Sequence, residues 1–68
     1  MPYDFTVEAA RHREMAEECR TMASAFGDAN LRRKLLQIAD EYDRMATQAE
    51  TLEIQLQELA ASNLKNEH

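Results

Sequence analysis

The usual sources of stability for a small protein are almost absent from this sequence. It has a single cysteine, Cys19, so no disulfide can form within one chain, and no CxxC or Cys/His cluster indicates structural zinc. A chain of 68 residues buries too small a share of its surface to be stable alone without such help. Oligomerisation is the source of stability that remains.

Helix breakers and strand formers are also scarce. The chain has one Gly, one Pro and no Trp, and Ala, Glu, Leu, Arg, Met and Gln dominate, as in coiled coils and long helices. No apolar run approaches the roughly 18 residues of a membrane span, and the first residues lack the basic start and apolar segment of a signal peptide. We therefore expect an all-α protein of the cytoplasm, with no membrane contact.

The chain has fewer basic residues than acidic ones. The formal net charge is −5 and the pI is about 4.9, which argues against a general affinity for nucleic acid or for anionic membranes. The only basic run, Arg32, Arg33 and Lys34, lacks the aromatic or further basic support of a nucleic-acid surface. We interpret it as a group of solvated charges and expect no nucleic-acid partner.

Apolar residues recur at spacings of three and four in two blocks. The first block holds Phe5, Met15, Cys19, Met22 and Phe26, and the second holds Leu31, Leu35, Ile38, Tyr42, Met45, Ala49, Leu52, Leu56 and Leu59. This heptad spacing predicts two amphipathic helices. Alanines follow the same period beside both stripes, and their small size favours close antiparallel packing.

Turn signals separate the two blocks. The step from Phe26 to Leu31 is five residues, which breaks the heptad. Gly27 can adopt the left-handed conformation that follows a helix, and Asp28 is a favourable N-cap for the next one. We predict one helical-hairpin domain over residues 1–68, with a helix over about 6–26 capped by Asp4 or Thr6, a turn at 27–28, a helix over about 29–62 and a frayed tail over 63–68.

The two predicted helices differ in length, at about 31 and 51 Å. Folding the chain at Gly27 places Phe5 near Leu52, so Leu56 and Leu59 have no partner within the chain. Each leucine forfeits about 1.5–3 kcal/mol if it stays in water. The excess length of the second helix therefore predicts association with another chain.

We expect the hairpins to associate as a coiled-coil-like four-helix dimer, with a tetramer or an unknown protein partner as open alternatives. An antiparallel dimer is favoured, since it brings each acidic carboxyl-terminal half toward the basic turn of the other chain, with the second helices crossing near Thr47. The predicted oligomer interface is Leu35, Ile38, Tyr42, Met45, Ala49, Leu52, Leu56 and Leu59. The predicted core within one hairpin is Met15, Cys19, Met22, Phe26 and Leu31.

Residues 11–50 resemble a pattern found in short, uncharacterised bacterial helical proteins. The matching positions are Glu18-Cys19-Arg20, Asp28, Leu35-Leu36, Ala39, Tyr42, Ala46 and Ala49-Glu50. The resemblance implies a bacterial helical hairpin and carries no established activity.

Residues able to do chemistry are few. Glu8 and His12 lie four apart, within reach on one helix face, but no second acidic or His pair lies on the apolar stripe of the other helix to complete a metal site. Cys19 occupies a core position, where a thiol is a small hydrophobic group, and Tyr42 can pack beside His12. The chain lacks paired carboxylates, a nucleophile with its base, and a phosphate loop.

Two functional hypotheses follow from these patterns. The first is a non-enzymatic, homo-oligomeric interaction protein, such as a scaffold, adaptor or regulator, without cofactor, metal or catalytic residues. The alternative is a bundle that binds a metal or a small ligand near Glu8, His12, Cys19 and Tyr42.

Overall fold

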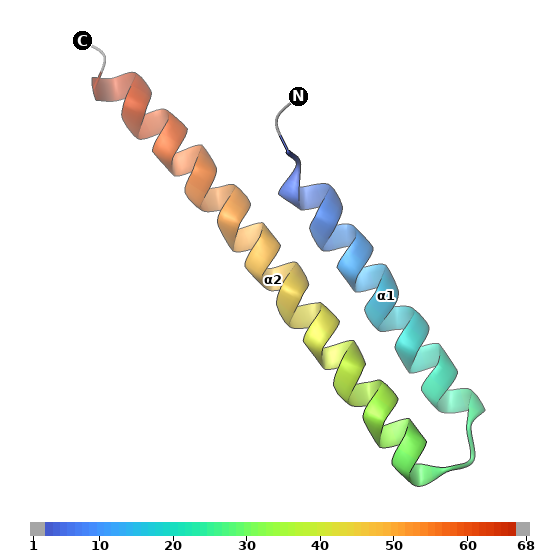
Figure 1. Cartoon of the computed structure of the whole chain (residues 1–68). Coiled ribbons are helices and arrows are strands. Elements are labelled where there is room, and N and C mark those ends of the chain that lie inside the picture. The colour runs from blue at the N-terminus through green and yellow to red at the C-terminus, as the bar shows by residue number, and fades with distance from the viewer. Residues whose placement is uncertain (1–2, 67–68) are drawn as a thin grey trace.

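The computed structural model describes residues 3–66, with side chains up to Asn63, and this part of the chain is a helical hairpin. Helix α1 spans Phe5–Ala25 and helix α2 spans Ala29–Asn66, and the two run antiparallel along each other (Figure 1). The described residues hold no strand. The predicted all-α hairpin is confirmed, whereas the dimer is taken up below as a proposal.

Both helices begin at an aspartate. The carboxylate of Asp4 accepts hydrogen bonds from the backbone N–H groups of Thr6, at 2.9 Å, and Val7, at 3.4 Å. Asp28 does the same for Asn30, at 2.9 Å, and Leu31, at 3.4 Å. These bonds satisfy donors that the first turn of a helix otherwise leaves free. Asp4, rather than Thr6, is the first cap.

The turn between the helices is formed without a left-handed residue. Helix α1 ends at Ala25, and Phe26 follows it in an extended conformation with φ −98° and ψ 141°. Gly27 does not have a positive φ. The left-handed Gly27 was therefore a wrong prediction, because the extended Phe26 already reverses the chain before Asp28 starts α2.

Gly27 can consequently be replaced. A Cβ built at this position meets nothing within 4 Å, and the backbone conformation suits any L residue. We expect Gly27→Ala to raise the free energy of unfolding by about 0.4–1 kcal/mol, because alanine restricts the unfolded chain. Urea unfolding followed by circular dichroism measures this change, and a clear loss of stability would contradict the described turn.

Helix α2 is much longer than α1, with 38 residues against 21, and continues beyond the start of α1 (Figure 1). It extends to Asn66, four residues past the predicted end at 62, because no Gly or Pro follows Gly27 to stop it. Of the predicted frayed tail, residues 63–66 are helical and residues 67–68 lie outside the described part. The molecule is a rod 63 Å long, and α2 does not bend back to cover its own end.

Candidate functional site

Small side chains fill the contact between α1 and α2. Its buried residues are Ala9, Ala16, Cys19 and Ala23 from α1 and Ala39, Ala46 and Ala49 from α2. All of them except Ala23 form two clusters, one flanked by Phe5 and the other by Tyr42. No large side chain of the described residues is fully buried. The small residues let the helices approach closely but provide little apolar burial.

The five residues predicted for the hairpin core differ in how far the structure buries them. Cys19 is buried, as a free thiol between Ala16 and Ala39. The other four remain 37–46% exposed in the single chain, and these are Met15, Met22, Phe26 and Leu31. They lie beside the contact rather than in it, because the alanines occupy the line where the two helices meet.

One side of the hairpin collects large exposed apolar residues, which we call the apolar face. In both helices, the residue one position before a buried alanine is large and apolar, as in Met15 and Met22 of α1 and Ile38 and Met45 of α2. The exceptions are Glu8, before Ala9, and Gln48, before Ala49. The full set on this face is Met15, Met22, Phe26, Leu31, Ile38, Met45, Leu52, Leu56 and Leu59, all more than a third exposed.

The opposite side carries the ion pairs between the helices, and we call it the ion-pair face. Residues four positions after the buried alanines lie on this flank of the interhelix contact, and all of them are charged except Gly27. Arg13 pairs with Glu50, and Arg20 pairs with Asp43 and, at 3.5 Å, with Asp40. The hydrogen bond with Asp43 raises the pKa of Arg20 above its ordinary value. These pairs orient the two helices and leave the apolar face on the other side.

Most residues of the predicted oligomer interface lie on the apolar face. Ile38, Met45, Leu52, Leu56 and Leu59 are exposed, and Leu35 and Tyr42 are half-buried beside them. Ala49 is different, because it is buried between α1 and α2 together with Ala9 and Ala46. It is a residue of the hairpin contact and is not accessible to a second chain.

The far end of α2 has no cover. Every side chain from residue 54 to residue 63 is exposed, and we call residues 54–66 the overhang. At 1.5 Å per residue this segment is about 20 Å long. Ile54, Leu56 and Leu59 are 56%, 47% and 59% exposed there. Tyr3 does not shield them, because its ring packs on Phe5, with the ring centroids 4.7 Å apart.

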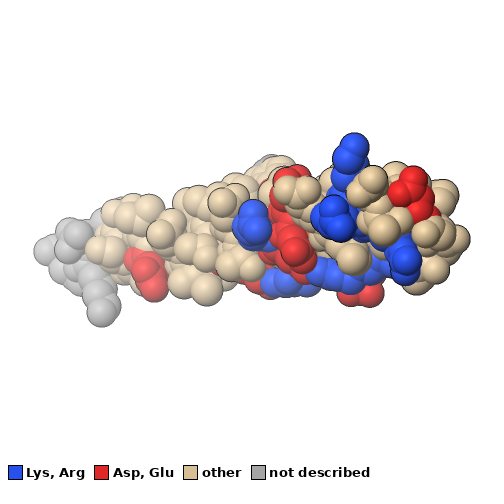
Figure 2. Space-filling model, turned by 90° about the horizontal axis from the view of Figure 1, so that it is seen from below, with Lys and Arg blue, Asp and Glu red and all other residues tan. Residues whose placement is uncertain are grey.

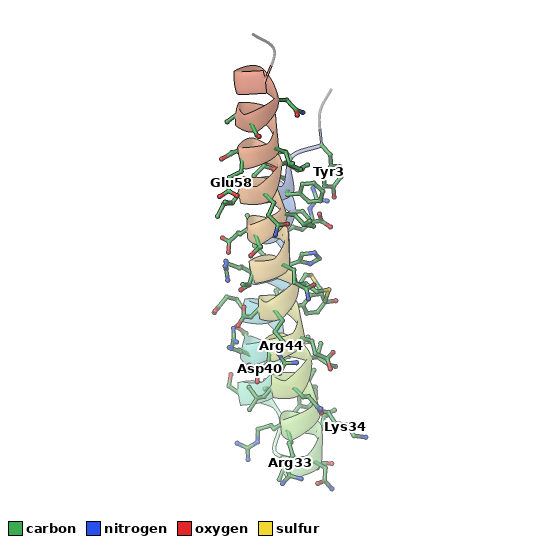
Figure 3. The ribbon with its side chains drawn as sticks, turned by 90° about the vertical axis from the view of Figure 1, so that its left-hand side faces the viewer. Tyr3, Arg33, Lys34, Asp40, Arg44 and Glu58 are labelled. Carbon is green, nitrogen blue, oxygen red and sulfur yellow. The ribbon has the colours of Figure 1, made fainter. Side chains whose placement is uncertain are left out.

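Charge is unevenly distributed along the rod. Arg33 and Lys34 lie at the turn end of α2, and Glu58 lies near the other end (Figure 3). On the face shown in Figure 2, charged side chains gather over the turn half, and the half that ends in the overhang is mostly uncharged. The apolar face is thus continued by an overhang whose described side chains include only one charge, that of Glu58.

The candidate ligand site is sparse. His12 Nε2 lies 3.6 Å from Glu8 Oε1, and the rings of His12 and Tyr42 stack with their centroids 6.1 Å apart. A hollow of about 270 Å³ beside them is lined by Phe5, Glu8, His12, Met45, Gln48, Ala49 and Leu52. Cys19 lies apart from it, in the cluster with Ala16 and Ala39. Over residues 3–66, no group of three His, Cys, Asp or Glu side chains is arranged to hold a metal ion.

Glu8 has a second neighbour. The nearby Glu8 carboxylate raises the pKa of the Tyr3 phenol. The carboxylate is therefore shared between Tyr3 and His12 at the amino end of α1. This arrangement supplies local polar contacts at the edge of the hollow.

Comparison with protein-family models, curated proteins and solved structures finds no match. Neither described helix has an apolar segment long enough to span a membrane. The function must therefore be argued from the geometry of the hairpin.

Proposed function

We propose that this chain is a non-enzymatic, homo-oligomeric helical interaction protein that acts through protein–protein contacts of its apolar face. One observation carries the proposal. The two helices bury alanines and a cysteine against each other and leave the larger apolar side chains in water on one side. A surface of contiguous apolar residues beside a charged opposite side is typical of an interaction surface.

The exposed area supports the same proposal. A compact monomer of 7.8 kDa exposes about 4,400 Å² of surface, and this chain exposes 5557 Å². The excess is about 1,200 Å² per chain, or about 2,300 Å² for two chains. Stable interfaces bury about 1,200–2,000 Å² in total, and obligate homodimers bury more. The excess surface of the rod is thus large enough to form an interface of this size.

Two neighbouring residues provide a matched test. Ile38, on the apolar face, is 41% exposed, and Leu36, on the side of the ion pairs, is 46% exposed. Replacing Ile38 with Glu removes about 1.5–3 kcal/mol of burial from each chain, hence twice that from a twofold dimer. We expect Ile38→Glu to weaken self-association at least 100-fold and Leu36→Glu to leave it nearly unchanged.

Sedimentation equilibrium over a range of protein concentrations measures the effect of both variants. The two proteins carry the same added charge on the same helix, so a general effect of charge changes both equally. A native chain that remains monomeric at high concentration would refute the proposal, as would equal masses for the two variants.

A further inference from the structure

We propose that the apolar face binds a second copy of this chain in an antiparallel arrangement, in which the overhang of each chain lies along the turn half of its partner's α2. This inference rests on the proposed self-association and adds its orientation and register. It identifies the occupant of the overhang, which one hairpin cannot cover.

Length fixes the register. Helix α2 spans Ala29–Asn66, and its midpoint lies between Thr47 and Gln48. Two antiparallel copies overlap over their whole length only if the twofold axis crosses this midpoint. A crossing at Thr47, half a residue from this midpoint, sets Leu35 opposite Leu59 and Ile38 opposite Leu56. Leu56 and Leu59 of the overhang then meet apolar residues from the turn half of the other chain, whereas Ile54 lies on the same side of α2 as Leu36 and stays outside this contact.

Heptad geometry is compatible with the same register. Along α2, Leu31, Ile38, Met45, Leu52 and Leu59 form one series at intervals of seven, and Leu35, Tyr42, Ala49 and Leu56 form the other. In an antiparallel pair, a residue of one series packs beside a residue of the other. A crossing near Thr47 places Tyr42 opposite Leu52 and satisfies this rule, except at Met45, whose counterpart Ala49 is buried against α1.

Charge favours the antiparallel orientation. Helix α2 begins with Arg32, Arg33 and Lys34 and has no acidic residue in its first turn. Beyond them, acidic residues outnumber basic ones among the described side chains, with Asp40, Glu41, Asp43, Glu50, Glu53 and Glu58 against Arg44. This order adds to the helix dipole instead of opposing it. An antiparallel neighbour sets opposite ends side by side, whereas a parallel neighbour sets like ends together.

Spin labels on three glutamines of α2 test the arrangement. Gln37, Gln48 and Gln55 are all exposed and lie on one side of α2, since their spacings of 11 and 7 residues are close to whole turns. Each is changed to Cys in a Cys19→Ala background, labelled with a nitroxide, and measured by double electron–electron resonance. The axial distance between symmetry-related labels grows by about 3 Å for each residue of displacement from the twofold axis.

We expect the shortest distance at Gln48, with axial separations of about 30 Å at Gln37 and about 23 Å at Gln55. Three equal distances would overturn the antiparallel orientation, and a minimum at another residue would overturn the register. A monomeric mass in the same samples would instead refute the self-association, so the two failures are distinguishable. Unlabelled Cys19→Ala must match the native mass and helicity. If it does not, Cys19→Ser is the second background.

Discussion

Ala16→Leu is expected to lower the stability of the hairpin by about 1–3 kcal/mol. Ala16 is completely buried in the contact between α1 and α2, close to Cys19 and Ala39. Three additional carbon atoms do not fit between two helices whose contact consists of alanines, so the helices must separate or the leucine must leave its preferred rotamer. Each kcal/mol corresponds to a fall of about 4–8 °C in Tm for a domain of this size.

Ala10→Leu is the control for this substitution. Ala10 lies in the same helix but is exposed, and leucine and alanine have similar helix propensities. We expect its stability to stay within about 0.5 kcal/mol of the native value. Thermal unfolding followed by circular dichroism compares the two variants at one protein concentration, since association shifts the apparent Tm. Equal melting temperatures would show that α1 and α2 are not in close contact at Ala16.

Leu56→Glu is expected to dissociate the protein and to melt the overhang together. Leu56 is 47% exposed in the single chain and is covered, in the proposed dimer, by the turn half of the partner. Two copies of the substitution remove about 3–6 kcal/mol of apolar burial, which corresponds to a loss of about 10²–10⁴ in affinity. An isolated helical segment as short as the overhang is marginal in water, so it frays once the partner is lost.

The decisive part of this prediction is that the sedimentation mass and the helicity fall together. Residues 54–66 are 13 of the 59 helical residues, so their melting lowers the helical signal by about a fifth. Gln55→Glu, on the solvent side of the overhang, adds the same charge and should keep both the mass and the helicity. A Leu56→Glu protein that is monomeric and fully helical would show that the overhang is stable alone, which would remove the reason for a partner.

Local signals in the sequence predict the hairpin almost completely. Asp28 and the break in the heptad after Phe26 locate the turn, because a cap and a change of register are properties of neighbouring residues. Phe5 and Leu52 line one hollow, as the predicted register requires. The end of α2 is predicted less well, since no breaker marks it and helix ends fray.

The heptad pattern does not reveal which residues are buried between α1 and α2. Met15 and Ala16 are neighbours, and both belong to an apolar stripe wide enough to include two adjacent helix positions. Which of them points at the second helix depends on how the two helices are rotated. The pairs of Arg13 with Glu50 and Arg20 with Asp43 accompany the observed rotation, and a single helix pattern does not reveal them. Their positions four residues after the alanines are the signal that could have found them.

The alanine contact has a further consequence for the connection at residues 26–28. Ala9, Ala16 and Ala23 repeat every seven residues, and so do Ala39 and Ala46, so displacing α1 by about 10.5 Å along α2 brings alanine against alanine again. The contacts between alanines are therefore similar in each of these alignments of α1 along α2. They do not by themselves select one alignment. The brevity of the linking segment makes the choice, because a chain of three residues leaves no slack for α1 to move by two turns. Lengthening that link would give one amino-acid sequence several interchangeable hairpins.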